Sequence, residues 1–251
     1  MNKRKIFNLL TTHFELPTFK EYFLDMCDQI PDYIMTMPSS TSGKYHNATQ
    51  CQEHGQLYHI FMFQSVLEHL LRLKGNKERF DTPEERDAMR CVPAFHDAIK
   101  CGTGGSQYTV QDHPLLAAQW VLNTKVEHSL PTEYKYMIAD MCEAHSGEWN
   151  KDRSGKVIMS EPRNAREFLI HECDILASRA DLDWIISPEL KAALGGVVPQ
   201  EPNLDDFTIP MGKYRGRKLV EVFSLDPDYV RWMRDNIDRQ PLKAMVEKLY
   251  A

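Results

Sequence analysis

The feature that most constrains the fold is the helical spacing of apolar residues, which recurs through most of the chain. The clearest example runs from Gln56 to Lys74, where one apolar face extends over about five turns. Gly75 and Asn76 follow this segment and indicate where the helix ends. The sequence therefore predicts a mainly α-helical protein.

Start signals locate further helices. Thr82 is a typical N-cap residue, and Pro83 suits the first turn of the helix that follows it. We expect this helix to break near Pro93 and to continue over residues 94–100. The other predicted helices of this region cover residues 20–30, 113–123, 131–144 and 164–181.

The composition changes after residue 194. Paired glycines, followed by Pro199 and Pro202, predict a linker over residues 195–206. We expect residues 1–194 to form one helical domain and residues 207–251 to form a small α+β module. In this module the pattern predicts short strands at 207–211 and 218–222 and helices at 227–236 and 241–250.

Composition excludes several classes of protein. Of the 251 residues, 42% are apolar and 26% are charged, which excludes a disordered or collagen-like chain. No run of about eighteen apolar residues predicts a membrane span, and no apolar stretch follows the basic N-terminus to form a secretory signal. The six cysteines form no C-x-x-C pair, so we expect reduced thiols and a cytoplasmic location.

The net charge of −6 is divided unevenly. Residues 207–251 contain 9 Lys and Arg against 6 Asp and Glu, whereas residues 1–206 contain 21 against 30. An acidic domain repels a polyanion unless metal ions and a basic attachment compensate for its charge. The division therefore predicts a catalytic domain with a basic accessory module.

The strongest chemical signal is the pair His96-Asp97, with Lys100 close behind it. Neighbouring side chains on a helix point about 100° apart, so both reach one cavity only if a metal lies between them. Lys100 follows His96 by one helical turn, where its ammonium group could hold a phosphate oxygen beside that metal. Asp174 lies among apolar residues, a costly place for a carboxylate that is neither paired nor metal-bound.

The order of these residues resembles the HD-domain metal-dependent phosphohydrolase superfamily, in its phage and bacterial type. The resemblance covers about residues 20–185, and a phage origin would place the protein in the cytoplasm of a bacterial host. Where the family has a second glycine, an acid and an alanine, this chain has Gln56, Tyr58 and Cys173, and none of these differences removes a ligand. The matching elements are Ser42–His46, Gly55–His59, His96–Lys100, Asp112-His113, Glu143–Gly147 and Cys173–Ser178.

The resemblance implies a helical bundle around a centre of two divalent ions, of Mn, Fe, Ni, Co, Zn or Mg. An activated hydroxide would attack phosphorus in line, with Asp97 and Lys100 as the catalytic residues. Asp97 would bridge the ions, and Lys100 would stabilise the phosphoryl charge. The implied ligands are His59, His96, Asp97 and Asp174 for one ion, with His113 and His145 adding the second.

Other polar residues keep two interpretations. His46 contacts the substrate or supports a ligand, or it lies in a solvated loop. Arg179 reaches phosphate at the rim of the cavity, or it faces solvent. The histidines at 13, 69, 128 and 171 are interpreted as ordinary surface or core residues.

The C-terminal segment resembles the small C-terminal module of exonuclease X-like proteins, through its P-x-G-K-Y-x-G element at Pro210–Gly216 and a later Y-x-x-W. Basic side chains beside an aromatic ring suit phosphate contact and base stacking. Alternatively, the glycines permit a hairpin and the aromatic residues form its core. The candidate nucleic-acid contacts are Lys213, Tyr214, Arg215, Arg217 and Lys218.

These observations predict an enzyme that cleaves phosphodiester bonds of nucleic acid or oligonucleotides and has no membrane partner. The first alternative is a nucleotide phosphohydrolase acting on a dNTP, a nucleoside monophosphate or a cyclic nucleotide. The second is a non-catalytic regulator that binds nucleotides or nucleic acid. The oligomeric state stays open.

Overall fold

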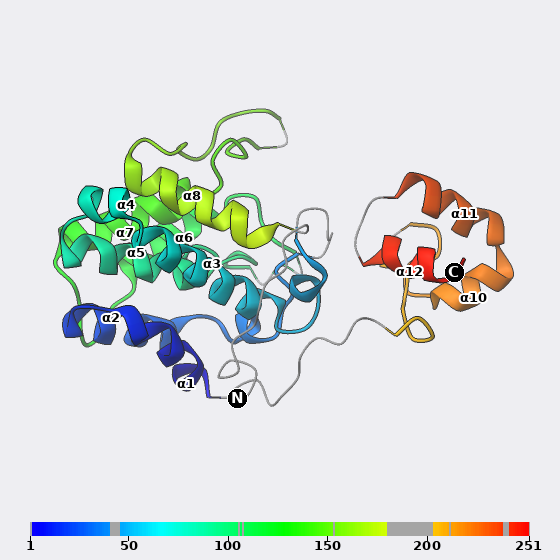
Figure 1. Cartoon of the computed structure of the whole chain (residues 1–251), viewed down its shortest axis with the longest axis horizontal. Helices are drawn as coiled ribbons and strands as arrows, with labels where there is room; N and C mark the ends of the chain where they lie inside the picture. Colours follow the sequence, from blue (N-terminus) through cyan, green and yellow to red (C-terminus); the bar gives the residue numbers. More distant parts are fainter. Residues whose placement is uncertain are drawn as a thin grey trace.

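The computed structural model describes residues 2–40, 46–104, 106, 108–152, 154–179, 203–210, 212–237 and 241–250. The protein is mainly helical, as predicted (Figure 1). The helices up to residue 179 are α1 (Lys3–Asn8), α2 (Pro17–Gln29), α3 (Gly55–Leu71), α4 (Lys74–Arg79), α5 (Pro83–Phe95), α6 (His113–Asn123), α7 (Thr132–Ala144) and α8 (Ala165–Ser178), with short 3-10 turns at Leu9–His13, Asp32–Met35 and Ala48–Cys51.

Four helices form the centre of this region. α5 and α8 pack against each other, and each also packs against α3 and α7 (Figure 1). α6 lies along α7, and α2 lies against α5. α3 is buried on most of its circumference, which its nearly continuous apolar sequence requires. This packing brings the first half of α3 and the second half of α8 close to the end of α5.

The segment around Pro93 differs from the prediction. α5 runs through Pro93 without a break and ends at Phe95, so the predicted helix over 94–100 is wrong. Residues 96–100 form turns instead, closed by the bonds from Ala98 N to Phe95 O and from Lys100 N to Asp97 O. The imidazole Nδ1 of His96 lies 3.1 Å from Pro93 O, so the side chain competes for a carbonyl at the helix end.

The C-terminal region has a hydrophobic core of its own. It contains α10 (Leu219–Leu225), α11 (Pro227–Asn236) and α12 (Leu242–Lys248) (Figure 1). The predicted strand at 218–222 is wrong, because α10 places Leu219 and Val222 on one buried helical face. Among the described residues of this region, extended pairing is limited to one bridge between Thr208 and Lys218.

Three further predictions concern the linker, the cysteines and membrane-spanning helices. The region 180–202 lies outside the described residues, and with it most of the predicted linker and the boundary at 194. All six cysteines are free thiols. No helix in the described part of the chain combines the length and apolar character needed to cross a bilayer.

Candidate metal centre

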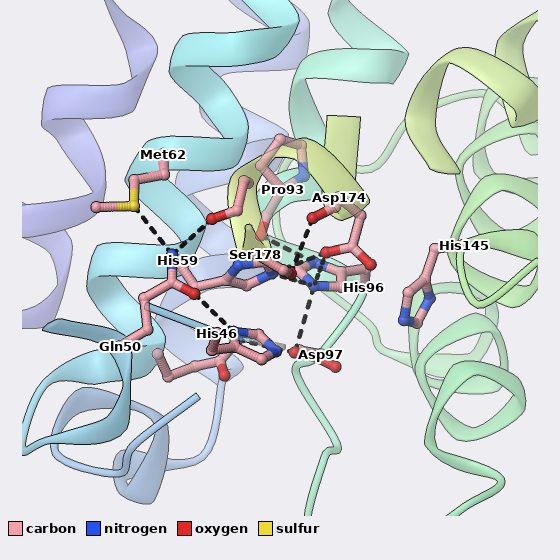
Figure 2. A network of polar contacts seen from close by, with 12 residues as sticks. His46, Gln50, His59, Met62, Pro93, His96, Asp97, His145, Asp174 and Ser178 are labelled. Atoms are coloured by element: carbon pink, nitrogen blue, oxygen red, sulfur yellow. Dashed lines mark hydrogen bonds and ion pairs between the residues drawn. The ribbon is translucent and has the colours of Figure 1, made fainter. Parts of the chain in front are cut away.

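The six predicted ligands come together from five helices. His59 lies in α3 and Asp174 in α8, and both point toward His96 and Asp97 (Figure 2). His96 and Asp97 follow the last residue of α5 directly. The two remaining ligands also lie at helix ends: His113 is the first residue of α6, and His145 directly follows α7.

Five of these residues form two groups that could each hold a metal ion. His59, His96 and Asp174 make the first group, and His96, Asp97 and His145 make the second. Within each group the candidate ligand atoms lie within 4.8 Å of one another. His113 joins the second group through Asp97, since its Nε2 lies 3.0 Å from Asp97 Oδ1.

Three of the imidazoles are held in one orientation. The Nδ1 atoms of His96, His113 and His145 lie 3.1, 2.8 and 2.7 Å from a backbone carbonyl three residues earlier in the chain. A carbonyl oxygen only accepts, so each Nδ1 donates, and Nε2 of the neutral ring keeps its lone pair. This is the arrangement that an imidazole ligand needs before it binds a metal.

The centre consequently has more acceptors than donors. The Nε2 atom of His96 faces Asp97 Oδ2 at 3.3 Å and His59 Nε2 at 3.2 Å. Asp97 Oδ1, although buried, accepts no hydrogen bond with suitable geometry. His59 Nε2 has one proton at most to share between His96 and Asp174 Oδ1, which lies 2.9 Å away.

Such a set of atoms requires positive charge. Burial alone would lower the pKa of His96, but the carboxylates of Asp97 and Asp174 raise it above its ordinary value. Buried imidazoles and carboxylates are the ligands of divalent transition ions. The residues present therefore fit the divalent cations that the resemblance implies.

Lys100 lies beside the carboxylate of Asp97. Its Nζ is 2.6 Å from Asp97 Oδ2, and both side chains are buried. Burial alone would raise the pKa of Asp97, but Lys100 and then His96 hold it well below its usual range. Gln56 completes this contact: its Nε2 donates to Asp97 Oδ2 at 3.0 Å, and its Oε1 accepts from Lys100 at 3.2 Å.

His46 lies at the edge of the centre, where its ring packs against His59. The amide Nε2 of Gln50 donates to Ala177 O at 2.7 Å, so its Oε1 faces His46 Nδ1 at 2.6 Å (Figure 2). Burial, followed by the nearness of His59, lowers the pKa of His46 to about 4. His46 is therefore a neutral, oriented imidazole near neutral pH.

Arg179 does not continue the face of α8 that carries Asp174. It follows the last residue of α8 with a backbone that is no longer helical and forms an antiparallel bridge with His46. Gln50 and Gln56 were not among the candidates from the sequence. Each is a buried amide just before or within the first turn of α3, and that pattern is the one local signal they carry.

In the C-terminal region, part of the predicted basic cluster is already paired. Lys213 lies 3.0 Å from Asp226, and Lys218 lies 2.8 Å from Asp206. The Tyr214 hydroxyl donates to Asp226, the N-cap of α11, so this half-buried ring helps to hold the module together. Arg215 donates to the Tyr108 hydroxyl at 2.9 Å.

Two other side chains are available at this surface. Arg217 is exposed, and no described residue pairs with its guanidinium group. Trp232 is 51% exposed and stacks on Tyr229, with ring centroids 5.7 Å apart. Tyr229 is in turn packed edge-on against Tyr214, so the exposed indole has a rigid support.

Comparison with known proteins identifies this C-terminal region. Residues 209–238 match the family described as exodeoxyribonuclease X-like C-terminal. This is the module that the sequence resembles, and the match covers all of α10 and α11. No curated protein and no solved structure matches the chain.

Proposed function

We propose that the protein is a metal-dependent phosphohydrolase with an HD-type centre, which cleaves phosphodiester bonds of nucleic acid or oligonucleotides. The observation that carries the proposal is the surplus of buried acceptor atoms formed by His96 Nε2 and by Asp97 Oδ1, which faces His113 Nε2. Buried acceptors that face one another repel unless a cation lies among them. The proposal thus rests on the chemistry of the donor set.

Each group has its own part in this centre. His59 and Asp174 would hold one ion, and His145 with His113 would hold the other. One Nε2 atom binds one ion, so His96 would hold a single ion at a time, whereas Asp97, with two oxygens, could contribute to both. A divalent ion held here would lower the pKa of a water molecule and offset the charge of a phosphoryl group.

The neighbouring side chains would bind and orient the substrate. Lys100 supplies a buried ammonium group next to Asp97, and Gln56 limits the directions in which it can turn. We assign Lys100 to a phosphoryl oxygen. His46 and Arg179, adjacent through their backbone bridge, would contact the substrate at the edge of the centre.

The C-terminal region supports a polymeric substrate. The family it matches is named for an exodeoxyribonuclease. The same small module carries an exposed, supported indole and a guanidinium with no described partner, groups that suit an unpaired base and its phosphate. We therefore favour nucleic acid over a free nucleotide.

The test is a substrate panel with the purified full-length chain and Mn²⁺. The panel contains single-stranded DNA, single-stranded RNA, dNTPs, nucleoside monophosphates and cyclic nucleotides, with the Asp97→Asn variant as the control. The proposal predicts cleavage of at least one polymer, and loss of that cleavage in Asp97→Asn. Cleavage of free nucleotides alone would favour the nucleotide phosphohydrolase, and no hydrolysis with any of the six metals would exclude both enzymes.

A further inference from the structure

A histidine outside the six candidate ligands contacts the backbone of one of them. His171 lies on α8, one turn before Asp174. Its Nδ1 is 2.6 Å from the backbone oxygen of His145. Because that oxygen only accepts, the imidazole donates, and the bond joins α8 to the turn that carries His145.

The same turn is shaped around the ring of His171. Gly147 has a φ of +56°, in the left-handed region that residues other than glycine disfavour. A Cβ atom at position 147 would lie 2.1 Å from Cε1 of His171. Backbone and ring therefore fit together only because residue 147 has no side chain.

This contact supports a ligand of the second group only. Asp174, on the same helix, belongs to the first group, whereas His145 occurs only in the second. Within its own segment, the ring of His145 is fixed by one bond, from Nδ1 to Cys142 O at 2.7 Å. Support from His171 adds a second constraint, which acts through the backbone.

We propose that His171 is a positioning residue, which fixes His145 and thereby sets the affinity of the His96–Asp97–His145 group for a divalent cation. This inference rests on the proposed metal centre. Loss of an outer partner of a metal ligand typically lowers metal affinity by about 10–100-fold. We expect that loss in the second group alone.

The experiment is a Mn²⁺ titration of the full-length protein, with free Mn²⁺ measured by electron paramagnetic resonance. We compare the wild type with His171→Leu, which removes the donor, and with His171→Asn, whose amide can donate from a similar position. His69→Leu is the matched control, since His69 is exposed and bonds to Ser65 O within its own helix. Gly147→Ala tests the same contact from the other side.

The wild type should show two classes of site. His171→Leu and Gly147→Ala should lower the affinity of one class by about 10–100-fold, and His171→Asn should restore most of it. If His171→Leu and Gly147→Ala both leave the two classes unchanged, or weaken them equally, the positioning role is overturned and the metal centre stands. If the wild type binds neither Mn²⁺ nor any other of the six metals, the proposed function itself fails.

Discussion

The Nζ atom of Lys100 lies 2.6 Å from the Oδ2 atom of Asp97, and fewer than a tenth of either side chain is exposed. Each group stabilises the charge of the other where water cannot do so. The pair therefore places an ammonium group beside the carboxylate of the second group of candidate ligands. Substitution of one residue of the pair should therefore change the function of the other.

Replacing Lys100 with methionine removes the charge and keeps most of the chain length. We predict that Lys100→Met retains bound metal but lowers turnover by about 10²–10³-fold, the usual effect of losing one group that stabilises transition-state charge. Lys135→Met is the control, since Lys135 bonds to Leu122 O elsewhere on the surface. Steady-state hydrolysis and metal analysis measure both effects. Unchanged turnover would show that Lys100 has no role in the reaction.

The N-terminal region is joined to α5 by charge, and this predicts a pH effect on stability. Hydrogen bonds from Arg86 and then Arg90 lower the pKa of Glu15 from 4.5 to about 2, although burial opposes the shift. A lowered pKa in the folded state stabilises the protein above the unfolded value, and that stabilisation is lost as the pH falls toward 2.

We therefore predict that Glu15→Gln lowers the free energy of unfolding at pH 7 and that its difference from the wild type shrinks between pH 4.5 and pH 2. Urea unfolding across this range measures the difference. Glu78→Gln should show little effect, because the 3.8 Å pair of Glu78 with Lys74 is exposed. A difference independent of pH would mean that Glu15 acts by packing and not by charge.

At the C-terminal surface, Trp232 and Tyr214 should differ in their contribution to nucleic-acid binding, because the indole is exposed and the tyrosine ring is half-buried. We predict that Trp232→Ala weakens binding of single-stranded oligonucleotide by about 1–3 kcal/mol, the typical value of one stacked base. Tyr214→Phe keeps its ring and loses the bond to Asp226, so its affinity should change little. Fluorescence anisotropy gives both affinities, and an unchanged affinity in Trp232→Ala would contradict stacking of a base on the indole.

The basic residues of the C-terminal region should also differ in their contribution to nucleic-acid binding. Arg217 has no described partner, whereas Lys218 is paired with Asp206. We predict that Arg217→Ala reduces the slope of log affinity against log salt by about 1, as expected for one lost phosphate contact. Lys218→Ala should reduce it less. Equal slopes in the two variants would show that the ion pair opens when nucleic acid binds.

The sequence predicted several helices closely but not the end of the clearest one, because α3 ends at Leu71 and α4 runs through Gly75 and Asn76, which were predicted to end it. α6 and α11 match their predicted ranges, and Thr82 caps α5 through its side chain as expected. The wrong predictions have physical causes. A short apolar segment such as 218–222 fits a strand or a helix equally, and a core formed by distant residues decides between them.

The candidate site was likewise predicted in part. Six residues selected by type and order in the sequence lie together in space, although the reason given for His96 and Asp97, a shared helix, is wrong. The supporting contacts could not be predicted. Gln56 meets Asp97 only through the packing of α3 beside α5, and His171 meets His145 only through that of α8 beside α7.

The most direct test of the central claim is the metal content of the purified protein, compared among the wild type, His96→Ala and Asp97→Ala. Elemental analysis and hydrolysis of a phosphodiester are measured on the same samples. The account predicts that the wild type holds divalent metal and is active, and that both variants lose metal and activity together. Unchanged metal content and activity in the variants would contradict it.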